Sequence, residues 1–170
     1  MKNARIWITT ILLLTAASLC LQAQTAADIA EHSMDDRTCS NGSVAGDWAF
    51  TETGTFILTT GAAPFAAVAS YTLDSNGNLV GTATSSLGGT VSEFTLEGSG
   101  AVNSDCTGTL SIEVYKSGSL VRTANFDIVY VNNSRAARAI NTSLILADGT
   151  SIPTVVTFNA QKVFDGLRRP

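Results

Sequence analysis

The stretch AVASYTLDSNGNLVGTATSSL, residues 67–87, decides the fold class of this chain. Two runs of alternating apolar and polar residues, 67–74 and 78–87, flank the tripeptide SNG at 75–77. Asn-Gly readily adopts the positive φ angles that tight hairpin turns require. The alternation has the period of a strand with one buried face. The stretch therefore predicts an antiparallel β-hairpin.

From Gly46 onward the chain repeats this texture, with runs rich in Thr, Val, Ile and aromatic residues between glycine-containing turns. The other expected strands cover residues 47–58, 90–98, 100–104, 109–116, 120–131, 135–147 and 153–164. No segment has room for a crossover helix, so the pattern predicts an all-β fold, a single antiparallel barrel of about eight strands. A two-sheet β-sandwich is the alternative. Sequential hairpins favour the barrel, because a Greek key usually needs a longer connection.

Residues 1–23 have the pattern of a secretory signal peptide, with basic Lys2 and Arg5, an apolar run, and Ala23 at the expected cleavage point. The run is shorter than the roughly 20 apolar residues of a spanning helix, so no membrane span is expected after cleavage. Lipid anchoring through Cys20 is an alternative, although Leu19 takes the place of the usual small residue. We therefore expect a secreted or periplasmic protein.

The rest of the chain is expected to form a flexible N-terminal tail at 24–44, a β-barrel domain at 45–164 and a C-terminal tail at 165–170. Loss of Lys2 and Arg5 leaves eight basic and 14 acidic residues, a net charge of −6. Nucleic-acid binding depends on neutralising phosphates with Lys and Arg, so this acidic chain predicts no nucleic-acid partner.

Two of the three cysteines, Cys39 and Cys106, remain after signal removal. An even pair in an exported chain predicts a disulfide. A zinc site would need about four Cys, His or acidic ligands, which the domain does not offer. A nucleophilic role is disfavoured because Asp105 would raise the thiol pKa of Cys106.

Catalytic, cofactor and metal motifs are absent from the sequence, and we predict none of these sites. The single histidine, His32, precedes the expected barrel, so no Ser-His-Asp or Cys-His set can form inside it. Carboxylates within the expected strands are more simply explained as solvated strand faces; they are Glu52, Glu93, Glu97, Glu113 and Asp127.

A ligand pocket inside the barrel is the remaining chemical hypothesis. Arg122 and Arg138 share strand parity with apolar residues, and would meet an anionic ligand group at a barrel mouth if those faces point inward. Strand-end arginines more simply lay their stems on apolar surface and keep the charge in water, and a bulge would change the parity. The candidate pocket residues are Trp48, Phe50, Tyr71, Phe126, Tyr130, Arg122, Arg138 and Phe158.

The segment Gly46-Asp47-Trp48 resembles the G-x-W opening of lipocalin-type barrels. With the Asp74–Gly81 hairpin and the DCTGT segment at 105–109, the layout is similar to small secreted bacterial β-barrel proteins of lipocalin or calycin type. The resemblance implies a late basic residue over Trp48, for which Lys162, Arg168 and Arg169 are candidates.

The expected function is that of a secreted, non-catalytic barrel that binds a small apolar molecule. The alternatives are a barrel-type isomerase or hydrolase with lumenal Tyr, Asp or Arg, and an adhesin-like surface module. An eight-stranded barrel either fills itself with side chains or encloses one small ligand, and the interior volume distinguishes the two.

Overall fold

The structure is a computed structural model that describes residues 38–163. The expected signal peptide, Cys20, His32, most of the expected N-terminal tail, and Arg168 and Arg169 lie outside the described residues. Within the described part, no helix is both long and apolar enough to cross a membrane.

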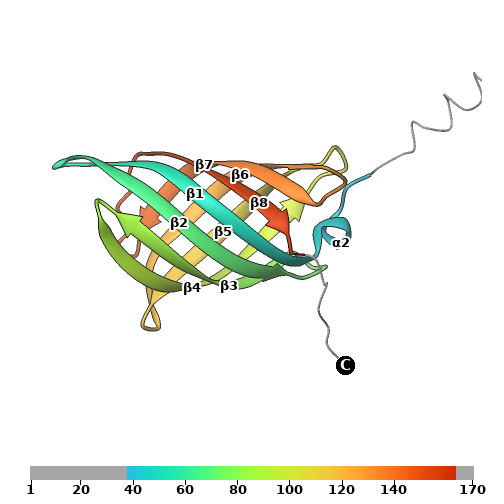
Figure 1. Ribbon diagram of the computed structural model, residues 1–170, viewed down its shortest axis with the longest axis horizontal. Coiled ribbons are helices and arrows are strands. Elements are labelled where there is room, and N and C mark those ends of the chain that lie inside the picture. Colours follow the sequence, from blue (N-terminus) through green and yellow to red (C-terminus); the bar gives the residue numbers. More distant parts are fainter. Residues whose placement is uncertain (1–37, 164–170) are drawn as a thin grey trace, which may run out of the picture. The chain divides into compact units, whose positions relative to one another are not determined.

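Eight antiparallel strands form a closed barrel in which each strand pairs with its sequence neighbours and β8 pairs with β1 (Figure 1). The strands are β1 Gly46–Leu58, β2 Gly61–Leu73, β3 Asn78–Leu87, β4 Thr90–Val102, β5 Thr107–Lys116, β6 Ser119–Val131, β7 Ala136–Leu146 and β8 Thr154–Lys162. This confirms the barrel and excludes the sandwich.

Two strand boundaries differ from the prediction. The runs 90–98 and 100–104 belong to one strand, β4. Strand β2 begins at Gly61 rather than at 67, because the whole of Gly61–Leu73 pairs with β1 despite its alanines and Pro64. Tertiary pairing overrides the weak strand propensity of those residues.

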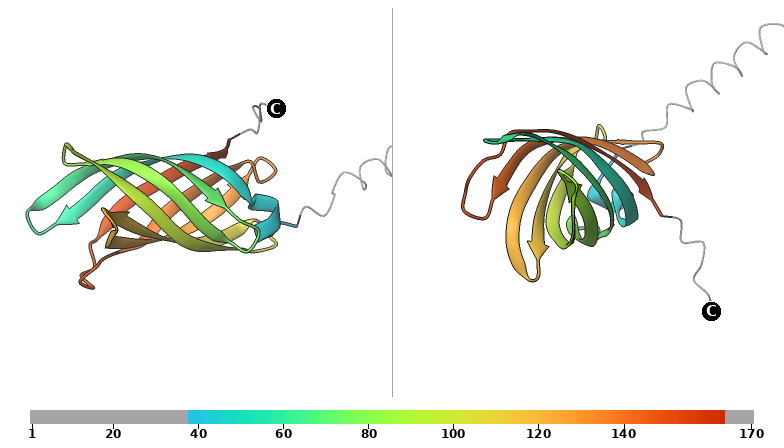
Figure 2. Two further views of the ribbon diagram at one scale, coloured as in Figure 1. Left: turned by 90° about the horizontal axis from the view of Figure 1, so that it is seen from below. Right: turned by 60° about the vertical axis from the view of Figure 1, so that its left-hand side comes forward.

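The barrel has two distinct ends. The proximal end carries the short helix α2 (Asn41–Val44) and the β2–β3, β4–β5 and β6–β7 turns. The distal end carries the β1–β2, β3–β4 and β5–β6 turns and the β7–β8 connection, and Figures 1 and 2 show the β3–β4 and β5–β6 turns standing apart from each other. Strand register explains this separation, since β4 pairs with β5 only from Thr95 onward and Thr90–Phe94 extends beyond it.

Helix α2 and Trp48 close the proximal end. Ser40 caps the helix, and the side chain of its last residue, Val44, is fully buried. The Trp48 indole Nε1 donates to the carbonyl oxygen of Val44 at 2.9 Å. Lys162 lies over the Trp48 ring with its Nζ 5.6 Å from the ring centroid, and the same Nζ donates to the Ser43 carbonyl oxygen at 2.9 Å. The last residues of the expected tail, 38–44, are thus part of the barrel's closure.

The Cys39–Cys106 disulfide is present and joins this N-terminal segment to the β4–β5 turn. Asp105 shapes that turn by accepting hydrogen bonds from the backbone nitrogen and the hydroxyl of Thr107. Cys39 is buried, and its sulfur lies 3.5 Å from the Ser134 hydroxyl in the β6–β7 turn. The bridge therefore ties the N-terminal segment to two turns of the proximal end.

Candidate ligand site at the distal end of the barrel

The aromatic side chains that the sequence singled out fill the proximal half of the barrel. Trp48 stacks on Tyr71 and meets Tyr130 edge-on, with ring centroids 6.2 and 6.0 Å apart. Phe50 and Phe126 each contact Phe158, at 5.4 and 5.1 Å. All six rings are buried in one hydrophobic core. Most of this set is packing rather than a pocket wall, since a filled barrel interior is dense.

A small cavity remains on the distal side of this aromatic core. Its volume is about 30 Å³, which is room for about one or two water molecules. Drug-sized ligands occupy roughly 300–1,000 Å³, so the lumen holds no preformed chamber of that size. The lining side chains come from six strands and are mostly apolar: Phe50, Glu52, Phe56, Phe65, Ala67, Ala83, Ser85, Leu96, Ile112, Val114, Arg122, Ala124 and Phe126.

Glu52 places a carboxylate inside this apolar cavity. It follows Trp48 and Phe50 on the inner face of β1. Burial raises the pKa of Glu52 from 4.5 to about 7, and the positive charge of Arg122 opposes part of that rise. Among the described residues no side chain hydrogen-bonds to this carboxylate. Perturbed carboxyl groups of this kind concentrate at functional sites.

Arg122 is the positive counterpart of Glu52 in the same cavity. Its guanidinium carbon lies 5.0 Å from the Phe94 ring centroid and 5.9 Å from that of Phe65. The arginine is half-buried, and burial lowers its pKa while the charge of Glu52 opposes that effect. Arg122 thus lines the interior, where it stacks on two rings instead of extending its charge into bulk water.

Arg138 lies exposed on the outer surface of the barrel, where it lines an open groove over β5 to β8 and does not face the lumen. A bulge in β7 causes this orientation, because Asn125 pairs with Ser143 while Phe126 pairs with Asn141, leaving Thr142 as an extra residue. The Asn141 amide stabilises the bulge by donating to the carbonyl oxygens of Asn125 and Ser143, both at 3.1 Å. An even-numbered residue before the bulge, such as Arg138, therefore faces outward, although the even-numbered Leu144 after the bulge faces inward.

The other strand carboxylates face outward, as the sequence interpretation expected. Glu93, Glu97 and Asp127 are exposed, and Glu113 is half-buried on the outer face, where it accepts a hydrogen bond from the Tyr115 hydroxyl at 2.6 Å. Glu52 is the exception that this interpretation missed. The sequence position of Glu52 could have shown that it faces inward, since it shares the even-numbered face of one strand with Trp48, Phe50 and Phe56.

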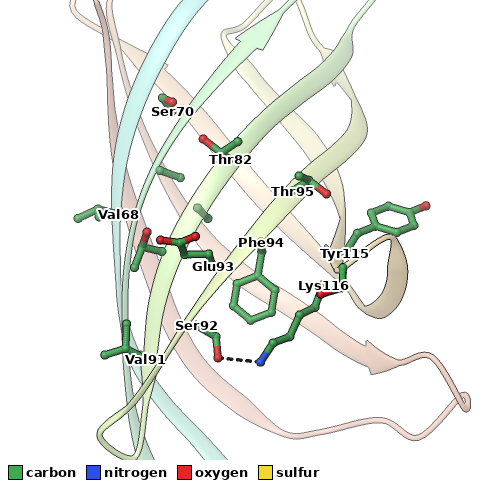
Figure 3. Close-up of a pocket in the computed structure, with 14 residues that line it drawn as sticks. Val68, Ser70, Thr82, Val91, Ser92, Glu93, Phe94, Thr95, Tyr115 and Lys116 are labelled. Carbon is green, nitrogen blue, oxygen red and sulfur yellow. Dashed lines mark hydrogen bonds between the residues drawn. The ribbon is translucent and has the colours of Figure 1, made fainter.

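A larger, open groove lies against Phe94 on the other side of the barrel wall. It has a volume of about 1110 Å³ and runs over β2, β3 and β4 to the end of β5. Figure 3 shows Lys116 reaching across it, with its Nζ donating to the Ser92 hydroxyl at 3.0 Å. The Lys116 Nζ also lies 5.9 Å from the Phe94 centroid. The Phe94 ring therefore lies close to two cations, Lys116 and Arg122.

Metal-ligating side chains do not cluster in groups of three or more anywhere in residues 38–163. The chemistry available at the distal end is that of one carboxyl group, one guanidinium and several apolar walls. Such a site can bind an amphipathic molecule or exchange a proton with it.

Comparisons with known proteins identify no family for this chain. No family model matches the sequence. No curated protein matches it either. Among solved structures, the chain is similar to one described as a redesigned beta barrel, at 15% identity and a TM-score of 0.42, over 73% of this chain and 95% of that one. The protein is thus placed in the class of small eight-stranded antiparallel barrels by its own topology.

Proposed function

We propose that the protein is an exported, lipocalin-like barrel that binds a small apolar or amphipathic molecule at its distal end. The observation that carries this proposal is the cavity in which Glu52 and Arg122 face apolar walls. Pockets that combine apolar walls with a few polar groups are the usual form of small-molecule sites. Because the cavity itself has room for only about one or two water molecules, the ligand enters it with one small group and lies along the distal side chains Phe56, Phe65 and Phe94.

The proximal end supports the lipocalin-like part of the proposal. The resemblance implied a late basic residue over the tryptophan of the G-x-W opening, and Lys162 occupies that place over Trp48. Export is supported by the disulfide between Cys39 and Cys106, because such bridges persist in oxidising compartments. Neither observation depends on the distal cavity.

Octanol, a short neutral probe, tests the proposal by calorimetric titration. Ala67 is buried and lines the cavity, whereas its neighbour Ala66 is exposed on the outer face of the same strand. We expect the probe to bind the wild type and Ala66→Leu equally, and Ala67→Leu at least about fivefold more weakly, a loss typical of filling a small apolar site. Equal binding to both variants, or no binding to the wild type, would contradict the proposal; thermal melts verify that both variants fold.

A second candidate is a lumenal isomerase or hydrolase in which Glu52 acts as a general base. The pKa of about 7 favours it, since the best general bases titrate near the working pH. Native mass spectrometry of the exported protein distinguishes the two, because a binder retains its ligand when Glu52 is replaced by Gln. An enzyme would instead accumulate unreacted substrate in the Glu52→Gln variant and release product from the wild type.

A further inference from the structure

Two cations converge on one aromatic ring at the distal end. The guanidinium carbon of Arg122 lies 5.0 Å and the Nζ of Lys116 5.9 Å from the Phe94 ring centroid. Strand β4 has no β5 partner before Thr95, so the barrel wall is incomplete beside this ring. Two positively charged side chains thus lie beside one aromatic ring on a chain whose formal net charge is −4.

Few ionisable groups face Glu52 from the surrounding strands. On the inner face, β3, β4, β5 and β7 contribute none, apart from Lys116 at the very end of β5. The inward ionisable groups of the remaining strands are Tyr71 from β2, Arg122 and Tyr130 from β6, and Lys162 from β8. Burial raises the pKa of both tyrosines, so they stay neutral at physiological pH. Lys162 belongs to the proximal closure over Trp48.

Arg122 is thus the charged group that acts on the pKa of Glu52, and it opposes the larger effect of burial. Its positive charge favours the ionised carboxylate, whereas the apolar surroundings favour the neutral acid. An anion that pairs with Arg122 would offset this positive charge and add a negative charge near Glu52. Both changes favour the protonated carboxyl group, which can then donate a hydrogen bond to the anion.

We infer that the distal site takes an anionic amphiphile whose charged group pairs with Arg122, and that binding is accompanied by protonation of Glu52. This inference rests on the proposed function and names the chemical class of its ligand. A cationic ligand is disfavoured, because Arg122 stays charged while Glu52 can be neutralised. The apolar part of the ligand lies against Phe56, Phe65 and Phe94. The linkage is reciprocal, so protons strengthen binding of the anion as much as the anion strengthens binding of the proton.

Calorimetric titration with octanoate, octanol and octylamine at pH 6 and pH 8 tests the inference. The three probes share one apolar chain and differ in charge. We expect octanoate to bind most tightly at pH 6, and about tenfold more weakly at pH 8, because the protonated fraction of Glu52 falls by that factor around a pKa of about 7. Octanol is expected to bind with little dependence on pH.

Two substitutions with matched controls separate the roles of the charges. Glu52→Gln should remove the pH dependence of octanoate binding, whereas the exterior Glu97→Gln should keep it. Arg122→Gln should weaken octanoate about tenfold or more, in line with loss of a charge-assisted pair, and leave octanol binding unchanged. The exterior Arg138→Gln should match the wild type. Thermal melts verify folding, and Arg122→Lys, which keeps the charge, provides a second test if Arg122→Gln does not fold.

The outcomes distinguish this inference from the function on which it rests. If octanol and octanoate bind equally at both pH values, or if octylamine binds best, the anionic ligand class is wrong and the binding function stands. If none of the three probes binds, the proposed function itself is overturned. Octanoate binding that keeps its pH dependence in Glu52→Gln would contradict the protonation step.

Discussion

Glu52 on β1 and Arg122 on β6 line the same cavity of the barrel, and each opposes the effect of burial on the other's pKa. Burial disfavours the charged form of each group, and the attraction between the two charges across the cavity offsets part of that effect. This relationship gives the distal end its chemistry, and it makes the stability of the barrel depend on pH.

Glu52→Gln should stabilise the protein at high pH relative to low pH. The folded pKa of about 7 lies above the ordinary value of 4.5, so the folded state binds the proton more tightly than the unfolded state does. Ionisation of Glu52 therefore costs stability as pH rises from about 4.5 to 7. Urea unfolding at pH 4 and pH 8 should show the variant gaining about 3 kcal/mol over the wild type across this window. A constant difference would contradict the burial of Glu52; Glu93→Gln is the exterior control.

Reduction of the disulfide should weaken the proximal end. The bridge joins residues separated by 67 positions, and closing a loop of that length stabilises by about 4 kcal/mol in the chain-entropy model. We expect the Cys39→Ser, Cys106→Ser double variant to lose a comparable amount in urea unfolding. In the unreduced wild type, mass analysis after alkylation should find neither cysteine modified, and modification of either would contradict the bridge.

Trp48→Phe should destabilise the barrel by about 2–3 kcal/mol, because it removes buried volume and leaves the Val44 carbonyl oxygen without the indole donor. Hydrogen exchange should then rise first in the residues around α2. A loss below about 0.5 kcal/mol would mean that Trp48 does not anchor the proximal closure.

Glu97→Lys should stabilise the protein slightly. Glu97 lies directly opposite Glu113 across β4 and β5, and like charges in this position are destabilising by several tenths of a kcal/mol. We expect a gain of about 0.5–1 kcal/mol that shrinks at high salt. Glu93→Lys is the matched control, because Glu93 lies in the part of β4 that extends beyond β5. An equal gain in both variants would point to net charge rather than to the cross-strand pair.

Strand alternation and turn residues were enough to predict the barrel and most of its strands. The hairpin at 75–77 formed because Asp74 accepts hydrogen bonds from the backbone nitrogens of Asn76 and Asn78, and Gly77 adopts a φ of 91°. The disulfide followed from counting cysteines in a chain that was expected to be exported. Local patterns of this kind need no knowledge of distant contacts.

The site was harder to predict because it depends on contacts across the barrel. Arg138 faces outward because of the bulge at Thr142, which is set by Asn141 bonding to the neighbouring strand. Glu52 was taken for a solvated acid because one strand does not reveal that Arg122 faces it from β6. Parity alone could have assigned Glu52 to the inner face, but not its partner or its pKa.

Backbone amide shifts in a nitrogen-15 NMR titration with octanol test the central claim, that the distal end binds the ligand, most directly. The account predicts that shifts concentrate around the cavity residues Phe56, Phe65, Ser85 and Arg122, and that Trp48 and the outer-face residue Ile140 are unaffected. Shifts confined to the outer groove around Val68 and Val91, or no shifts at all, would contradict it.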